Sequence, residues 1–256
     1  MSDDSYNRAR LIEARTVFSI VSHGQLDLVA NLLRDFAARE LTRARIIVTL
    51  NVPEDEDVLR TFTHLNLTVS RNSKPKGFGE NHNQAFEMVD CDFFVVVNPD
   101  IRLRNVDLKT LLAPFSVGDV GAVAPVVVSP VGTVEDSARR FPTVSRLLKR
   151  VLFGDRKSDY HWTFESIPID WAAGMFVAFR ADAFREIGGF DVRYFLYMED
   201  ADICRRLGIA AWKTVLQPAS VVIHDAQRQS RRDFRYLKWH LASAFRFLFL
   251  PVGKIR

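Results

Sequence analysis

Apolar residues follow two alternating patterns along the chain. Short continuous runs such as Phe93–Val97 have the length and composition of strands that are buried on both faces. Longer stretches such as Asp27–Arg39 place their apolar side chains at helical spacing, with polar residues between them. Strands of this kind that alternate with helices are typical of a parallel sheet with helices packed on it, so the pattern predicts an α/β fold.

The alternation is clearest in the first half of the chain. It predicts strands at Thr16–Ser22, Arg45–Asn51, Leu67–Asn72, Phe93–Val97 and Gly121–Val128, with helices at Asp27–Arg39 and Glu80–Val89. In the less regular second half the pattern predicts strands at Met175–Arg180, Ala211–Leu216 and Val221–His224, and helices at Ser145–Phe153, Ala181–Ile187, Asp200–Leu207 and Asp233–Phe249. No shift in composition marks a linker, so we expect a single domain over residues 1–225 and a C-terminal extension over residues 226–256.

The composition is that of a folded chain. Of the 256 residues, 48% are hydrophobic and 26% are charged, which excludes a disordered or low-complexity protein. No apolar run approaches the roughly 18 residues of a transmembrane helix, and the first 15 residues are too polar for a signal peptide. Cys91 and Cys204 form neither a disulfide framework nor a zinc motif, so we expect a reducing cytoplasm.

Positive charge is concentrated at the C-terminal end. The formal net charge is +4, yet Asp225–Arg256 alone carries eight Lys or Arg against two Asp. A nucleic-acid-binding domain spreads its basic residues over a folded face, so no nucleic-acid partner is expected.

The predicted helix Asp233–Phe249 is basic and amphipathic. One face of the helix contains Leu237, Leu241, Ala244 and Leu248, and it is widened by Trp239, Phe245, Phe247 and Phe249. Basic residues cluster at the beginning of the helix, namely Arg231, Arg232, Arg235 and Lys238. Such a helix either packs its apolar stripe on the domain or lies on an anionic membrane surface. The apolar residues exceed what one packing stripe needs, so we expect peripheral membrane association.

Polar residues at the ends of the predicted strands are the candidates for chemistry, because ligands of parallel sheets bind beyond the carboxyl ends of the strands. The segment Asn98-Pro-Asp100 follows an apolar strand. It is either an ordinary turn or the place of a carboxylate that holds a divalent cation under a diphosphate. His224 also ends a strand and is a possible metal ligand. Signatures of kinases, serine hydrolases and zincins do not occur.

Two further segments leave an alternative open. In Tyr197-Met-Glu-Asp-Ala-Asp202, the carboxylates either form the acidic first turn of a helix or include a general base. In Lys76-Gly-Phe-Gly-Glu-Asn-His-Asn83, the glycines either belong to a plain loop or allow a ligand to approach the backbone at a helix N-terminus.

Several segments occur in a recognisable order along nearly the whole chain, from about residue 16 to 249. They are Ser22-His23, Gly77–Asn83, Val97–Ile101, Asp170-Trp-Ala-Ala-Gly174, Arg180-x-x-x-Phe184, Gly188-Gly-Phe-Asp191, Tyr197–Asp202 and His224. Together they resemble glycosyltransferase family 2, specifically its small bacterial rhamnosyltransferase-like members.

The resemblance implies a GT-A fold, in which a mixed, mostly parallel sheet is flanked by helices. A Rossmann-like nucleotide-binding half, about residues 16–128, would be fused to an acceptor half, about residues 129–225. It implies an inverting transfer of a sugar, L-rhamnose from dTDP-L-rhamnose, to a lipid-linked saccharide during bacterial surface polysaccharide synthesis at the inner face of the cell membrane. The alternatives are a UDP-sugar donor, a nucleotidyltransferase, or a non-catalytic sugar-binding relative.

On the donor side, the resemblance implies a nucleoside pocket formed by Ser22, Asn51, Asn72, Gly77 and Asn81. Asn98 and Asp100 occupy the family's Asp-x-Asp site, where Asn98 replaces the first acid and removes one charge. Asp100 and His224 would bind Mg²⁺ or Mn²⁺, and Arg228 and Arg231 could fold over the diphosphate.

On the acceptor side, Asp200 matches the family's catalytic base, and Glu199 would orient the acceptor or the base. Trp171 and Gly174 sit where the acceptor loop packs against the donor sugar. Arg139 and Arg140 either meet an anionic acceptor or are surface charges.

Overall fold

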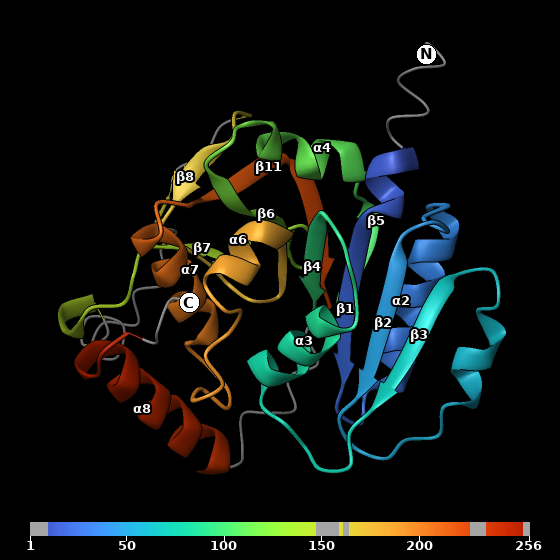
Figure 1. The fold of residues 1–256 in the computed structure, drawn as a ribbon, viewed down its shortest axis with the longest axis horizontal. Coiled ribbons are helices and arrows are strands. Elements are labelled where there is room, and N and C mark those ends of the chain that lie inside the picture. The colour runs from blue at the N-terminus through green and yellow to red at the C-terminus, as the bar shows by residue number, and fades with distance from the viewer. Residues whose placement is uncertain (1–9, 147–158, 161–163, 226–233, 253–256) are drawn as a thin grey trace.

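The computed structural model describes residues 10–146, 159–160, 164–225 and 234–252. Within them, a nine-stranded sheet has the order β3-β2-β1-β4-β10-β6-β11-β5, with β8 paired to β11, and β7 and β9 form a separate pair (Figure 1). The strands are β1 (Thr16–Ser22), β2 (Arg45–Leu50), β3 (Asn66–Arg71), β4 (Phe93–Val97), β5 (Ile101–Asn105), β6 (Val120–Val128), β7 (Ala138–Arg139), β8 (Ile167–Ile169), β9 (Trp171–Ala172), β10 (Phe176–Arg180) and β11 (Lys213–His224). The helices are α2 (Leu26–Ala38), α3 (Phe78–Glu87), α4 (Leu108–Leu112), α6 (Ala181–Glu186), α7 (Glu199–Ile209) and α8 (Phe234–Phe249), with 3-10 helices η1 (Asp57–Thr61) and η2 (Ala113–Ser116).

The strand directions bring many carboxyl ends to one edge of the sheet. Strands β3, β2, β1 and β4 are mutually parallel, and β6 is parallel to β11. Strand β10 lies antiparallel between β4 and β6, so β6 and β11 run in the same direction as β1 to β4. The amino end of β10 therefore reaches the edge at which the parallel strands end. This mixed, mostly parallel sheet is the one the sequence predicts.

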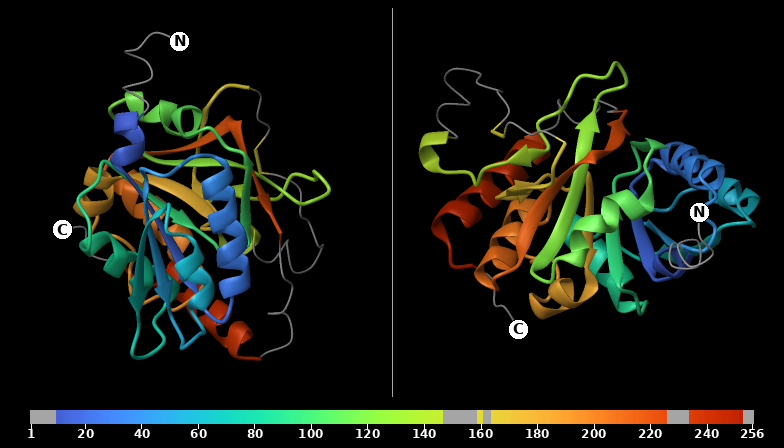
Figure 2. Two further views of the ribbon diagram at one scale, coloured as in Figure 1. Left: turned by 90° about the vertical axis from the view of Figure 1, so that its right-hand side faces the viewer. Right: turned by 90° about the horizontal axis from the view of Figure 1, so that it is seen from above.

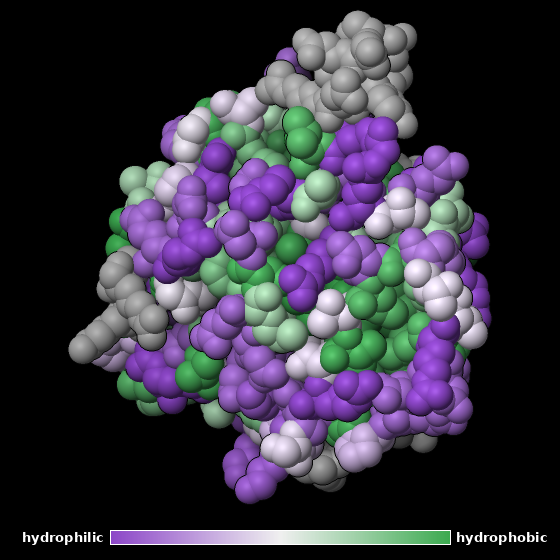
Figure 3. Space-filling view, turned by 45° about the vertical axis from the view of Figure 1, so that its right-hand side comes forward, coloured by the Kyte–Doolittle hydropathy of each residue, from purple (hydrophilic) through white to green (hydrophobic). Residues whose placement is uncertain are grey.

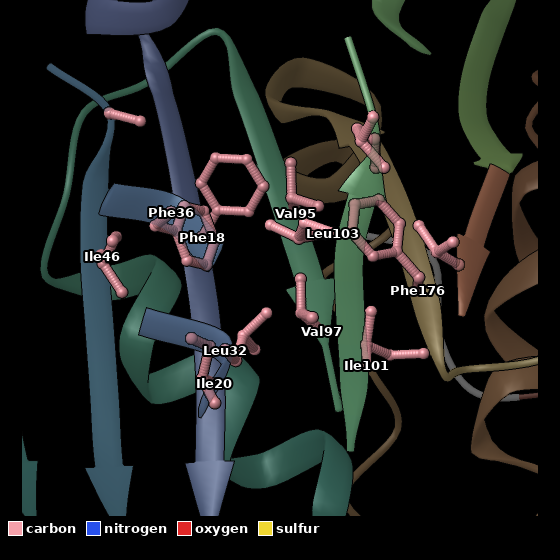
Figure 4. Packing of buried hydrophobic residues seen from close by; sticks show 14 of the residues in the cluster. Phe18, Ile20, Leu32, Phe36, Ile46, Val95, Val97, Ile101, Leu103 and Phe176 are labelled. Atoms are coloured by element: carbon pink, nitrogen blue, oxygen red, sulfur yellow. The ribbon is translucent and has the colours of Figure 1, made fainter. Parts of the chain in front are cut away.

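Helices cover both faces of the sheet, because its strands carry apolar residues on both sides (Figure 2). Phe18 and Ile20 pack with α2 and α4 on one face, while the alternate residue Val17 belongs to the core on the face of α3, α6 and α7. Figure 4 shows the first core, where Phe36 of α2 meets Phe18 edge-on at 4.7 Å between ring centroids. The two cores hold the strands, and hence the strand ends, in fixed positions.

Some elements differ from the prediction. Strand β11 is a single 12-residue strand with a shift in register between Gln217 and Val221, where the sequence pattern indicates two strands. Strand β5 and helix α4 were not predicted. They pack against the core through residues such as Leu103 and Leu111. The helix expected at Ser145–Phe153 lies outside the described residues from residue 147 onward.

The sheet is continuous across the predicted boundary at residues 128 and 129. Strand β10, from the second half of the sequence, is inserted between β4 and β6 of the first half. The division into a nucleotide half and an acceptor half stays a prediction. On the side of the molecule shown in Figure 3, hydrophilic residues cover most of the surface and hydrophobic residues gather in patches.

Candidate active site

The ends of β1, β2 and β3 are joined to α3 by a network of side-chain amides. Asn51 Oδ1 accepts hydrogen bonds from Asn72 Nδ2 at 2.9 Å and from the Lys76 backbone N–H at 2.8 Å. Asn72 Nδ2 also donates to Asn81 Oδ1 at 2.6 Å, and Asn81 Nδ2 donates to the Gly77 carbonyl at 2.9 Å. The structure thus brings together four of the five residues predicted for the nucleoside pocket.

Ser22, the fifth, lies at the end of the neighbouring strand β1. Its carbonyl accepts from the Asn51 backbone N–H at 2.8 Å, and its buried Oγ accepts from the Gln25 N–H at 3.1 Å. Asn81 is buried as well. These side chains therefore fix the backbone at the strand ends, and their contact with a nucleotide stays a prediction.

Gly77 is explained by close packing. A Cβ at this position would lie 2.8 Å from the carbonyl oxygen of Phe195. The backbone N–H of Phe78, at the start of α3, donates to the same oxygen at 2.9 Å. The first turn of α3 is thereby attached to the loop that precedes Glu199 and Asp200, so a segment predicted to bind the donor contacts one predicted to bind the acceptor.

Asp100 and His224 meet at the sheet edge, as the strand-end argument predicts. Asp100 follows β4 in the tight turn that leads to β5, where the Ile101 N–H donates to the Asn98 carbonyl at 3.2 Å. His224 ends β11, and its Nε2 lies 3.1 Å from Asp100 Oδ2. The other carboxylate oxygen, Asp100 Oδ1, is buried and has no hydrogen-bond partner in the part of the chain that the structure describes. Asn98-Pro-Asp100 therefore forms a turn, and this turn places a buried carboxylate oxygen at the sheet edge.

Glu135 is a member of this cluster that the sequence analysis missed. Its Oε2 lies 2.7 Å from His224 Nδ1, so the imidazole ring is held between two carboxylates. Burial lowers the pKa of His224, but the hydrogen bonds and charges of Asp100 and Glu135 outweigh it and raise the pKa to about 9. Across the described part of the chain, no group of three or more His, Cys, Asp or Glu is arranged to hold a metal ion.

Glu199 and Asp200 open helix α7 from a strained turn. Tyr197 and Met198, which precede them, have φ angles of 71° and 63°, a left-handed conformation that is costly for residues with side chains. Asp200 Oδ2 accepts from the Gly174 N–H at 3.0 Å, and Oδ1 accepts from the Ala201 N–H at 2.8 Å. The predicted base and the predicted acceptor-loop glycine are therefore in direct contact.

The two carboxyl groups share a poorly solvated environment. Burial, reinforced by the charge of Asp200, raises the pKa of Glu199 far above its ordinary value, and Glu199 Oε2 has no hydrogen-bond partner. Burial also raises the pKa of Asp200, although the Gly174 hydrogen bond and the charge of Arg139 oppose the shift. Hydrogen bonds to a carboxylate favour its ionised form, and both oxygens of Asp200 receive one from a backbone N–H, whereas Glu199 Oε2 receives none from the described residues.

Arg139 and Arg140 diverge because successive residues of a strand point to opposite sides. Arg139, in β7, has its Cζ 4.8 Å from the centre of the Trp171 ring in β9, and its Nε lies 3.2 Å from Asp136 Oδ2. Arg140 is exposed, with its Cζ 5.6 Å from the Tyr160 ring. Arg139 thus joins the Asp200 neighbourhood, whereas Arg140 lies on a separate surface.

Helix α8 packs one face on the domain and exposes another. Ser243 Oγ donates to the Leu196 carbonyl at 2.9 Å, the Trp239 ring lies 4.8 Å from the Phe195 ring, and Phe247 is buried. A second stripe at four-residue spacing is 55–61% exposed and consists of Leu237, Leu241, Phe245 and Phe249, which we call the outer stripe. None of the helices among the described residues has the length and apolar character needed to cross a membrane. Arg228, Arg231 and Arg232 lie outside the described residues.

Solved structures share this fold. The crystal structure of GalNAc-T7 with UDP, GalNAc and Mn²⁺ aligns with 91% of this chain and 48% of that chain, with a TM-score of 0.71 and 14% identity. The mannosyltransferase PcManGT from Pyrobaculum calidifontis, in complex with GDP-Man and Mn²⁺, aligns with 98% of this chain and 74% of that chain, with a TM-score of 0.62 and 15% identity. The fold is therefore the GT-A fold of glycosyltransferases, as expected from the sequence.

The chain belongs to the glycosyltransferase-like family 2, whose model matches residues 14–241. Rhamnosyltransferase WbbL of Escherichia coli (strain K12) is 31% identical over 242 residues, which are 90% of each chain. The N-acetylglucosaminyl-diphospho-decaprenol L-rhamnosyltransferase of Mycobacterium tuberculosis (strain ATCC 25618 / H37Rv) is 32% identical over 202 residues, covering 75% of this chain and 66% of the relative. The expected family and the assignment as a glycosyltransferase are confirmed.

Proposed function

We propose that this protein is an inverting rhamnosyltransferase that transfers L-rhamnose from dTDP-L-rhamnose to a lipid-linked saccharide in bacterial surface polysaccharide synthesis. The observation that carries the proposal is the 31% identity to a rhamnosyltransferase over 90% of both chains. The name of the mycobacterial relative includes a diphospho-decaprenol acceptor, which supports an acceptor on a lipid carrier. A UDP-sugar donor is the alternative within the same family.

On the donor side, Asp100 and His224 would hold a divalent cation, Mg²⁺ or Mn²⁺. The buried, unpartnered Oδ1 of Asp100 supports this, because hard cations prefer carboxylate oxygens. When bound, the cation neutralises charge on the departing nucleoside diphosphate. Asn98 contributes no charge, and we propose that Arg228 and Arg231 add positive charge there. The amide network of Asn51, Asn72 and Asn81 would shape the nucleoside pocket.

On the acceptor side, Asp200 would take the proton of the acceptor hydroxyl as the bond at the donor's anomeric carbon breaks. Asp200 would be the ionised member of the pair, because its two oxygens accept backbone hydrogen bonds that stabilise a carboxylate, and it would therefore be the one able to accept a proton. Direct displacement with a single base inverts the anomeric centre. Trp171 and Gly174 would position the sugar ring, and Arg139 beside Trp171 would face an anionic group of the acceptor.

The outer stripe of α8 would lie on the cytoplasmic face of the membrane. The opposite face of α8 contacts Phe195 and Leu196, which lie four and three residues before Glu199. A membrane under the outer stripe would therefore lie close to the proposed base, where a lipid-linked acceptor is needed. The exposed Lys238 and the basic residues Arg231, Arg232 and Arg235 would favour anionic lipids.

The donor is tested by thermal unfolding and transfer assays with a panel of nucleotide sugars. We expect dTDP-L-rhamnose with Mn²⁺ to raise the unfolding temperature and to support transfer to a lipid-linked saccharide, because a ligand that binds only the folded state stabilises it. UDP-glucose and UDP-N-acetylglucosamine serve as controls with a different base and sugar. Stabilisation and transfer with a UDP-sugar alone would replace the proposed donor.

Membrane attachment is tested with the double variant Leu241→Ser/Phe245→Ser on vesicles of phosphatidylglycerol and phosphatidylcholine. Burial of a Leu or Phe side chain contributes about 1.5–3 kcal/mol, so loss of both should weaken binding at least about 100-fold. Phe164→Ser removes a side chain that is 95% exposed outside α8 and should leave binding unchanged. Equal vesicle binding by the wild type and the double variant would contradict the proposed membrane face.

A further inference from the structure

Glu135 reaches His224 from a short turn that the sheet holds in place. After β6, the Ser129 N–H donates to the Thr133 carbonyl at 2.8 Å and closes the turn, in which Gly132 has a φ of 83°. The chain then returns along β6, and the Glu135 N–H donates to the Val127 carbonyl at 2.8 Å. Because β6 is the neighbour of β11, this return places the Glu135 carboxylate beside the residue that ends β11.

The two nitrogens of the His224 ring have different surroundings. Nδ1 lies 2.7 Å from Glu135 Oε2, and Nε2 faces Asp100 at 3.1 Å. Both carboxylates only accept hydrogen bonds, so Nδ1 donates to Glu135 and Nε2 donates to Asp100. If a cation replaced the proton on Nε2, the proton on Nδ1 would stay with Glu135, and the Nε2 lone pair would lie on the side of Asp100, whose Oδ1 has no hydrogen-bond partner among the described residues. The ring is thus oriented for a ligand between Nε2 and Asp100.

We propose that Glu135 is a positioning residue that holds the His224 ring with Nε2 directed toward the cation site. The inference rests on the proposed function, because it takes Asp100 and His224 as the residues that hold the cation. Carboxylates that accept the second ring proton of a metal-binding histidine fix its tautomer and its orientation, and their loss typically weakens metal binding about 10- to 100-fold. The Glu135 side chain is 29% exposed. If it formed only a structural ion pair with His224, its removal would have almost no effect on cation binding.

The experiment measures the Kd of Mn²⁺ by calorimetry in the presence of dTDP, for the full chain. We expect Glu135→Ala to weaken Mn²⁺ binding about 10- to 100-fold with little change in unfolding temperature. Glu135→Gln keeps an oxygen that accepts the Nδ1 proton, so its loss should be smaller than that of Glu135→Ala. Thr133→Ala alters an exposed side chain of the same turn and should bind Mn²⁺ as the wild type does.

The wild type and Asp100→Asn separate this inference from the proposed function. Strong binding by the wild type and weak binding by Asp100→Asn would support the cation site itself. If Glu135→Ala then bound Mn²⁺ as the wild type does, the role of Glu135 would be overturned while the cation site stood. Equal losses of Mn²⁺ affinity in Glu135→Ala and Glu135→Gln would indicate that Glu135 acts through its charge and not by orienting the His224 ring. This outcome would also overturn the role of Glu135. Equally weak binding by the wild type and Asp100→Asn would overturn both proposals.

Discussion

The first turn of α7 contains two kinds of buried carboxylate that differ in how they are compensated. Asp202, with a side chain that is 1% exposed, receives a hydrogen bond from Arg206 Nε at 2.7 Å and one from Arg205 Nη2 at 3.2 Å. Arg206 is buried too, and donates to the carbonyls of Ile187 and Gly189 at 2.9 and 2.7 Å. Three residues earlier, Glu199 is also buried, but its Oε2 has no hydrogen-bond partner among the described residues.

This difference distinguishes a structural acid from the two acids proposed to act in catalysis. A buried carboxylate with a buried guanidinium beside it is compensated, and it joins α7 to the loop of Gly188 and Gly189. Glu199 and Asp200 have backbone N–H groups and a distant arginine charge in place of an ion pair, so their pKa values rise. Perturbed pKa values of this origin cluster at functional sites. The environment of each acid, more than its position in the motif, indicates its role.

The largest expected effect is on the rate of transfer. Asp200→Asn keeps the shape of the side chain but removes the proton acceptor, and loss of a general base typically lowers kcat about 10²- to 10⁴-fold. Donor affinity should be nearly unchanged, whereas the free energy of unfolding should fall by about 1–3 kcal/mol, because the Asn amide nitrogen cannot accept one of the two backbone hydrogen bonds that Gly174 and Ala201 donate to Asp200. The measurements are kcat with saturating donor and acceptor, and donor binding by calorimetry. Near-normal turnover of Asp200→Asn together with an inactive Glu199→Gln would move the base to Glu199.

The converse effect is expected two residues further along the helix. Asp202→Asn leaves the Arg206 guanidinium buried without a counter-charge, and breaking a buried ion pair in this way costs about 3–5 kcal/mol. Denaturant unfolding should therefore show a large loss of stability. The matched control is Asp182→Asn, which breaks an exposed i,i+3 pair with Arg185 and should cost about 1 kcal/mol or less. Similar losses in the two variants would mean that burial does not set the role of Asp202.

The sequence predicts most residues of the candidate site but not the environment that the fold gives to each of them. The strand ends and the acidic motif identify Asp100, Asp200 and His224, since the carboxyl ends of parallel strands meet at one edge. Glu135 carries no such signal, because it is brought to His224 by the pairing of its segment with β6 after the turn at Gly132. In the sequence, Gly77 suggested a ligand site. In the structure, a side chain at this position would clash with the backbone of Phe195, which is more than 100 residues away in the chain.

The fold, like the candidate site, was predictable only in part from the sequence. Strand β1, Thr16–Ser22, and strand β4, Phe93–Val97, have the predicted bounds, because continuous apolar runs of this length fit a buried parallel strand. Strand β5 was missed although Ile101, Arg102, Leu103 and Arg104 alternate as in a half-buried strand, because the segment is short and directly follows a turn. Its pairing depends on β11, which is far away in the sequence, and local patterns do not contain that information.

A smaller effect is expected on how stability depends on pH. The pKa of Glu199 is raised in the folded state, so the folded protein binds a proton that the unfolded chain has released above about pH 4.3. Wild-type stability should therefore fall as the pH rises from about 4.5 toward neutrality, and Glu199→Gln should lack this part of the fall.

Denaturant unfolding between pH 4.5 and 8 measures this difference. The His224 contribution, which is also lost as the pH rises through about 9, is common to both proteins and cancels in the comparison. Glu87→Gln, at an exposed position of α3, should leave the pH dependence unchanged. A constant difference in stability between the wild type and Glu199→Gln at every pH would contradict the raised pKa.

The smallest effect is expected at the far end of α7. Gly208 is exposed within the helix, its φ is not in the left-handed region, and an added Cβ would meet nothing within 4 Å. Gly208→Ala should therefore raise the free energy of unfolding by about 0.4–1 kcal/mol, because alanine loses less conformational entropy in a helix. Since Gly208 lies more than two turns from Asp200, kcat should be unchanged, which would show that the stability of α7 and the chemistry at its first turn are separable. A fall in kcat as the helix is stabilised would instead mean that catalysis requires movement of α7, and denaturant unfolding with steady-state kinetics on the same sample distinguishes the two.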